Sequence, residues 1–151
     1  MRRVIGLAGV AGLAGLLAAC GGPQIDKTVP LQDGVYEADS SPDEEGAIGH
    51  LTVTVEGGAV TAAQFEVIQA NGQAKDESYG TDSSGEVANQ EYYRAAQQAV
   101  AAFDIYAAEL VEVGYPQDVD VISGATWAHD QFVEAAVAAL QQAQGEVPDG
   151  A

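Results

Sequence analysis

The chain has 151 residues, five Lys plus Arg against 23 Asp plus Glu, and a formal net charge of −18. This length fits one domain. So acidic a surface repels nucleic acid and anionic lipid head groups, which excludes both as ligands of the folded surface. A single cysteine excludes an internal disulfide. The charge also fits solubility or adaptation to salt, and composition alone does not separate these readings.

The first twenty residues have the order of an export signal. Arg2 and Arg3 precede an uncharged apolar run that ends at Ala19, directly before Cys20. The run is shorter than the roughly 20 apolar residues of a membrane span. Because Leu-Ala-Ala-Cys resembles a bacterial lipobox, we predict a signal peptide over residues 1–19 and lipidation of Cys20. An ordinary cleaved signal with a chance cysteine is the alternative.

The segment after Cys20 is polar and carries two prolines, Pro23 and Pro30, with no hydrophobic period. We predict that residues 20–32 comprise the lipidated cysteine and a flexible tether, which would reach roughly 40 Å at about 3.3–3.6 Å per residue. The folded domain is expected over residues 33–144, followed by a disordered acidic tail over residues 145–151.

The first half of the domain has the patterns of strands. Residues 33–38 begin with an Asp-Gly turn and predict a short strand. Apolar residues at positions 51, 53 and 55 alternate with polar ones, which is the period of a half-buried strand. Gly57-Gly58 then suits a two-residue hairpin turn. The expected return strand covers residues 59–68.

The return strand contains a break in its alternation, and an irregular loop follows it. Val60 is out of phase with Phe65 and Val67, which predicts a bulge near Ala62-Ala63. The segment from residue 71 to residue 87 is rich in Gly, Ser and Asp, and we predict a loop with little regular structure there.

The second half has the pattern of helices. Asn89 is a suitable cap for a helix that begins at Gln90, and Gly114 with Pro116 would end it. Apolar residues at spacings of three and four give this helix one buried face. They are Tyr92, Ala96, Ala99, Phe103, Tyr106 and Leu110. We place Tyr92 in the core and leave the position of Tyr93 open.

The last part of the domain combines an extended segment with a second helix. Residues 118–121 alternate and predict a short strand or extended segment, and the second helix is expected from Trp127 to about Gln144. The complete pattern predicts an α+β fold in which two C-terminal helices pack on a small antiparallel sheet.

The turn Ser123-Gly124-Ala125-Thr126 lies where the second helix begins. The first N–H groups of a helix lack intrahelical partners and favour phosphate. Gly124 permits positive φ or close approach of a bulky group, and Ala125 is small for the same reason. Thr126 offers a hydroxyl, while Ser123 would cap the helix or bond the phosphate. A plain Ser/Thr cap with a glycine turn is the alternative.

Residues 120–126, Asp-Val-Ile-Ser-Gly-Ala-Thr, match the Asp-x-x-Ser/Thr-Gly-Ala-Thr/Ser signature of the FMN-binding domain family. The Asp-Gly-x-Tyr start and the Gly-Gly hairpin resemble the same family. The resemblance implies that a flavin transferase joins FMN to the Thr126 hydroxyl through a phosphodiester. It also implies that Asp120 is part of what the transferase recognises.

Two further residues enter the predicted cofactor site through the resemblance. Lys75 follows a Gly-x-x-Lys pattern like that of short lipoprotein members. Trp127 would either stack on the flavin ring or pack on the sheet. We favour a solvated helix position for His129. The Glu-Thr-Pro-Gly-like motif of sodium-pumping quinone reductases and Rnf-type complexes is missing from the sequence, so the chain resembles the short lipoproteins.

We expect no catalytic residues and no structural metal, since no Ser-His-Asp set, paired catalytic carboxylates, dinucleotide-binding loop or calcium loop occurs. The expected function is electron transfer by a membrane-anchored extracytoplasmic flavoprotein at the bacterial cell surface, and not enzymatic catalysis. Its partners would be the flavin transferase, a membrane electron donor, an extracellular electron acceptor and the lipid membrane. One alternative is a surface lipoprotein that binds a ligand or partner protein without covalent flavin. Another is that the signal segment itself is a signalling peptide.

Overall fold

The computed structural model describes residues 22–145. Its elements in chain order are β1 (Gly34–Asp39), β2 (Ile48–Glu56), β3 (Ala59–Ile68), α1 (Gln90–Val113), the short 3-10 helix η1 (Pro116–Asp118) and α2 (Thr126–Ala143). The predicted signal peptide, Cys20 and all but the first residue of the predicted tail lie outside the described residues. Within residues 22–145, no helix is both long and apolar enough to cross a membrane.

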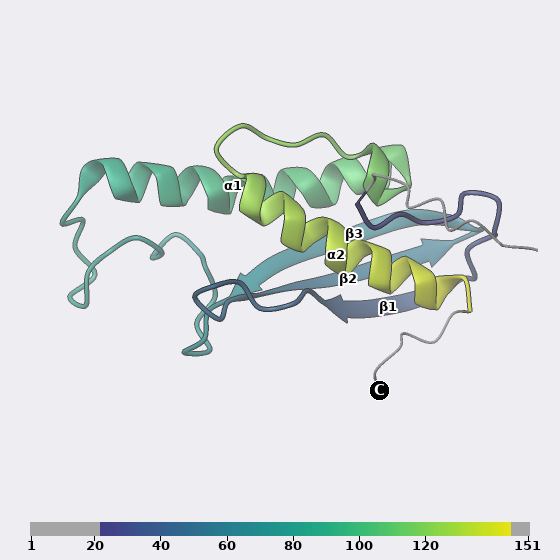
Figure 1. Ribbon diagram of the computed structural model, residues 1–151, viewed down its shortest axis with the longest axis horizontal. Coiled ribbons are helices and arrows are strands. Elements are labelled where there is room, and N and C mark those ends of the chain that lie inside the picture. Colours follow the sequence, from purple (N-terminus) through teal and green to yellow (C-terminus); the bar gives the residue numbers. More distant parts are fainter. Residues whose placement is uncertain (1–21, 146–151) are drawn as a thin grey trace, which may run out of the picture.

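The three strands form one antiparallel sheet in the order β1-β2-β3. Both helices lie on the same face of this sheet, as Figure 1 shows, with α1 along β3 and α2 across β2 and β1. This arrangement confirms the predicted α+β fold with two C-terminal helices packed on a small sheet.

The core fills the space between the sheet and the two helices. Leu51, Val53 and Val55 of β2 are at most 1% exposed, as their alternation predicts. The Phe65 ring of β3 meets Phe103 of α1 and Phe132 of α2 edge-on, with ring centroids 5.5 and 5.3 Å apart. Full burial of each large apolar side chain stabilises the fold by about 1.5–3 kcal/mol.

The hairpin between β2 and β3 follows the prediction with one shift. Gly57 and Gly58 both have positive φ, +60° and +76°, as a two-residue hairpin turn requires. The register changes so that Val55 pairs with Val60 and the preceding residue with Ala62. The extra residue is therefore Thr61, one position before the predicted bulge, and it lets Val60 share the buried face with Phe65.

The first turn of α1 lies outside the core. Asn89 caps this helix as predicted, because its side-chain oxygen accepts the N–H groups of Glu91 and Tyr92. The prediction that Tyr92 is in the core is wrong, since 54% of it is exposed. Figure 1 shows that α1 begins beyond the end of the sheet, so burial on this helix starts only at Ala96.

Residues 25–32 pack on the domain, so the prediction of a flexible tether is wrong for them. Ile25 and Leu31 are buried in the core. The Gln117 side chain accepts the Ile25 N–H (3.3 Å) and donates to the Ile25 carbonyl (2.8 Å), and the Gln32 N–H donates to the Ala143 carbonyl. Two isolated apolar residues show no periodic pattern, so the sequence did not predict their burial. The segment is held by contacts with residues far away in the chain.

Candidate functional site

Residues 122–125 form a tight turn immediately before α2. The Ala125 N–H donates to the Ile122 carbonyl at 3.0 Å, and Gly124 occupies the third position with φ +84°. That backbone conformation favours glycine, as in a type II turn. Apart from Gly124 and its two chain neighbours, no atom of the described chain lies within 4 Å of where a Gly124 Cβ would stand. The glycine is therefore required by its φ, and the space beside it is open.

The segment that leads into this turn is not a strand. η1 ends at Asp118, and residues 119–122 pair with no strand of the described chain. Their hydrogen bonds go to side chains instead, because Glu109 accepts the Asp120 N–H at 2.9 Å. Of the short strand or extended segment predicted here, the strand is not found among the described residues, and Val119 has an extended backbone.

Tyr106 of α1 holds the turn from its buried side. Its hydroxyl donates to the Ala125 carbonyl and accepts the Ile122 N–H, both at 3.1 Å. The side chain is fully buried, and this burial raises the pKa of the Tyr106 phenol. One hydroxyl therefore fixes both ends of the turn. The helical period predicted burial of the ring but gave no signal for the role of its hydroxyl.

His129 fixes the loop that enters the turn. Its ring lies 5.3 Å from the Tyr106 ring, and its Nε2 lies 3.1 Å from the Val119 carbonyl. A carbonyl only accepts, so Nε2 carries the hydrogen of this bond. The prediction of a solvated His129 is wrong, because this side chain packs on the loop.

The outer surface of the turn is open. Ser123, Gly124 and Thr126 are exposed. The N-cap of α2 is Ala125, and no side chain of the described residues caps it. Of the two roles predicted for Ser123, capping is therefore not found, and bonding a phosphate stays a prediction. The N–H groups of residues 126–128 find no acceptor within residues 22–145. The turn therefore offers the Thr126 hydroxyl and the N–H groups of Thr126 and Trp127 to its surroundings, while Ala128 is fully buried.

Two signature residues have surroundings that differ from the prediction. Ala125 is 1% exposed and packs into the core, so its small size suits the protein interior and not a cofactor. The Asp120 carboxylate is exposed and forms no hydrogen bond within the described part of the chain. The turn is oriented by Tyr106, Glu109 and His129, which the signature does not contain.

Lys75 and Trp127, which the sequence assigned to one site, are neighbours in the structure. The Lys75 Nζ lies 4.3 Å from the Trp127 ring centroid and 4.9 Å from that of Tyr79. It also lies 3.6 Å from Asp43 Oδ2, and the Lys75 side chain is buried. A buried ammonium group between two aromatic faces and a carboxylate is well compensated.

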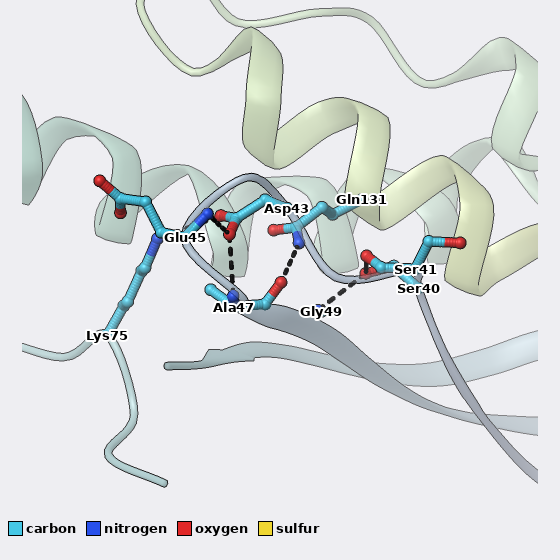
Figure 2. Close-up of polar contacts among 8 residues, drawn as sticks. All are labelled: Ser40, Ser41, Asp43, Glu45, Ala47, Gly49, Lys75 and Gln131. Atoms are coloured by element: carbon cyan, nitrogen blue, oxygen red, sulfur yellow. Dashed lines mark hydrogen bonds and ion pairs between the residues drawn. The ribbon is translucent and has the colours of Figure 1, made fainter. Parts of the chain in front are cut away.

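The loop before β2 holds Asp43 in place for this contact. Figure 2 shows that Asp43 Oδ1 accepts the N–H groups of Glu45 and Ala47, at 2.9 and 2.8 Å. Gln131 of α2 donates to the Ala47 carbonyl at 2.8 Å in the same view. The loop is thereby fixed to α2, and no sequence pattern had indicated Asp43.

Trp127 combines packing with partial exposure. Its ring meets Phe103 edge-on with centroids 6.1 Å apart, and the side chain is partly buried against the core. This ring contact is with Phe103 of α1 and not with a strand, and stacking of Trp127 on a flavin ring stays a prediction. Within residues 22–145, no group of three or more His, Cys, Asp or Glu side chains is placed to hold a metal ion.

No family model matches this sequence, and no functionally curated protein matches it. The crystal structure of the CPE2226 protein from Clostridium perfringens resembles the chain with a TM-score of 0.61 and 23% identity over 76% of this chain and 90% of that one. A solution structure from Clostridium thermocellum has 25% identity over 80% and 98% of the two chains, but its TM-score is 0.44. The first likeness concerns the fold alone.

Proposed function

We propose that the chain is an extracytoplasmic electron carrier that holds FMN on Thr126 through a phosphodiester. One observation carries the proposal: an exposed Thr126 hydroxyl stands beside the N–H groups of Thr126 and Trp127, which have no acceptor within residues 22–145, on a turn whose buried side the Tyr106 hydroxyl holds. A capping side chain, such as Asn89 at α1, would accept one or two such N–H groups. Gly124 beside them has open space at its Cβ position, which leaves room for a bulky group.

The physical chemistry of this turn suits a phosphate. Free N–H groups and the helix dipole provide positive potential at the start of α2. Few basic side chains compete for this role, because the chain has only five Lys plus Arg in total, two of them in the predicted signal peptide. A covalent bond compensates for the shortage of cations in a chain with 23 acidic residues.

The attachment step balances as a phosphoryl-group transfer from FAD. The Thr126 oxygen bonds to the phosphorus on the riboflavin side of the diphosphate, and the bond from that phosphorus to the bridging oxygen breaks. AMP leaves with the bridging oxygen and its electron pair, and the hydroxyl proton passes to solvent. A flavin transferase with a divalent cation would supply the catalysis, so this chain is its substrate.

In this proposal the flavin supplies the redox chemistry, and the protein supplies position and environment. Lipidation of Cys20 would keep the domain at a bacterial membrane, between a membrane electron donor and an extracellular acceptor. Two or more acyl chains give stable anchoring, since each buried methylene contributes about 0.8 kcal/mol.

The test is co-expression of the full chain with a flavin transferase, followed by denaturing electrophoresis and flavin fluorescence. We expect fluorescence that survives denaturation in the native chain and in Ser123→Ala, and none in Thr126→Ala. Both substituted residues are exposed, so neither change should unfold the domain. Absence of covalent flavin in all three would contradict the proposal and favour a surface lipoprotein that binds a ligand or partner protein.

A further inference from the structure

A cavity of about 430 Å³ lies between the loop after β3 and the start of α1. Its lining is polar apart from two tyrosine rings, and it includes one carboxylate, that of Asp82. The other main lining residues are Tyr79, Tyr92, Gln69, Asn71, Gln73 and Thr81. Among the described residues, no Lys or Arg lines this cavity. Its walls therefore disfavour a phosphate, and they suit an uncharged planar group with polar edges.

The cavity lies close to the residue that follows Thr126. The Lys75 Nζ is in contact with the Tyr79 ring and with the Trp127 ring, at 4.9 and 4.3 Å from their centroids. A single buried side chain thus separates Trp127 from Tyr79, which belongs to the wall of the cavity. Since Thr126 is the chain neighbour of Trp127, this row of contacts leads from the attachment residue to the cavity.

The wall of the cavity is held on α1. The Tyr93 hydroxyl donates to the Glu77 carbonyl at 3.0 Å, and Gln97 Nε2 donates to the Tyr79 carbonyl at 2.9 Å. Gly80 lies so close to α1 that a Cβ there would stand 2.9 Å from the Ala96 Cβ. These contacts hold the backbone of residues 77–80 on α1, so this wall of the cavity is preformed.

Tyr92 is the second aromatic residue that lines the cavity, and this position accounts for its exposure. It occupies a position of the apolar helical period but points to the cavity, with 54% of the residue exposed. Tyr79 and Tyr92 line the same cavity, and a hydrogen bond with Tyr79 raises the pKa of the Tyr92 phenol. Two adjacent phenol rings beside amide groups offer stacking to a ring and hydrogen bonds to its edge.

We infer that this cavity receives the isoalloxazine ring of the FMN carried on Thr126, with Tyr79 and Tyr92 in contact with the ring. The inference rests on the proposed function and adds the part of the site that holds the ring. A tethered ring has an effective concentration on the order of millimolar, so a polar cavity of low intrinsic affinity is sufficient to hold it.

The first test uses the full chain flavinylated at Thr126. Tyrosine in contact with a flavin quenches its fluorescence, so Tyr92→Leu should raise the fluorescence of the folded protein severalfold and lower its anisotropy. Tyr115→Leu removes a ring near η1 and is the matched control, with no expected change. Equal fluorescence and anisotropy in the native chain and both variants would overturn the inference.

The second test does not require covalent attachment. Free FMN is titrated to millimolar concentration into the full-length Thr126→Ala chain, and amide resonances are followed by NMR. We expect shifts at Gly80 and Thr81 that disappear in Thr126→Ala/Tyr92→Leu. No shifts, or shifts confined to other regions, would overturn the inference. Failure of covalent attachment with shifts at Gly80 would instead overturn the proposed function alone.

Discussion

The two long helices of this domain begin in opposite ways. At α1, the Asn89 side chain accepts the N–H groups of Glu91 and Tyr92, at 3.0 and 3.1 Å. At α2, the residues before the helix include Ser123 and Gly124, yet the N-cap is the buried Ala125 and no side chain of the described residues caps it. The start of α2 is held by hydrogen bonds on its buried side, and no side chain of the described residues caps its exposed side.

This difference shows where the fold completes its own hydrogen bonds and where it does not. A good cap stabilises a helix by about 1 kcal/mol, and α2 forgoes that stabilisation although capping residue types are adjacent. The Tyr106 hydroxyl binds the buried side of the turn, where it donates to the Ala125 carbonyl and accepts the Ile122 N–H. An external acceptor such as a phosphate would complete the outer side.

Loss of the inner support should have the largest effect on stability. Tyr106→Phe leaves the Ile122 N–H without its acceptor, and we expect the free energy of unfolding to fall by about 1–3 kcal/mol. Urea denaturation measures this change. Tyr36→Phe removes an exposed hydroxyl bond and should stay within about 0.5 kcal/mol. Equal losses in both variants would contradict the role of Tyr106.

Two glycines with similar backbone conformation allow the effect of backbone strain to be distinguished from an effect on flavin attachment. Gly124 before α2 and Gly114 after α1 have φ +84° and +82°, and both have open space at the Cβ position. Gly124→Ala and Gly114→Ala should each cost about 1–2 kcal/mol through strain in the left-handed region. Only Gly124→Ala should slow flavin attachment. A matching slowdown in Gly114→Ala would show that stability alone controls attachment.

Alanine at the two helix starts should reproduce the difference in capping. Asn89→Ala removes two hydrogen bonds and should lower the free energy of unfolding by about 1 kcal/mol. Thr126→Ala should change it by no more than about 0.5 kcal/mol, because this exposed hydroxyl caps nothing. Thermal unfolding of the unflavinylated proteins measures both. A larger loss from Thr126→Ala would mean that Thr126 is structural.

The smallest expected effect is on how the free energy of unfolding falls at alkaline pH. Burial raises the pKa of Tyr106 above the ordinary value of about 10, so the folded chain keeps a proton that the unfolded chain releases. The free energy of unfolding should therefore be constant below about pH 10 and fall as pH rises through the folded-state pKa. Tyr106→Phe should have a shallower fall, which urea denaturation at several pH values measures. An unchanged slope would contradict this assignment.

Much of the fold could be predicted because its signals are local. The alternation in β2, the glycine pair at residues 57–58 and the cap at Asn89 each specify their own structure. The failures share one cause, which is dependence on distant partners. Residues 118–121 alternate like a strand, but Asp120 donates its N–H to Glu109 of α1. Tyr92 keeps the helical period beyond the end of the sheet, where it lines a cavity and not the core.

The candidate site was predictable only in its outline. The signature located Thr126 and Gly124, since both properties, a hydroxyl and a positive φ, belong to single residues. The support of the turn by Tyr106 and the placement of Lys75 between Trp127 and Tyr79 join segments far apart in the sequence. No local pattern identifies a hydroxyl that will bridge such segments or a lysine that will be buried.

The measurement that tests the central claim most directly is the mass of the peptide that spans residues 120–133 after flavin transferase treatment. We predict one FMN group on Thr126, its retention in Thr126→Ser and Ser123→Ala, and its loss in Thr126→Ala. FMN on Ser123, or a peptide of unmodified mass from the treated native chain, would contradict the claim that the open start of α2 is a flavin attachment site.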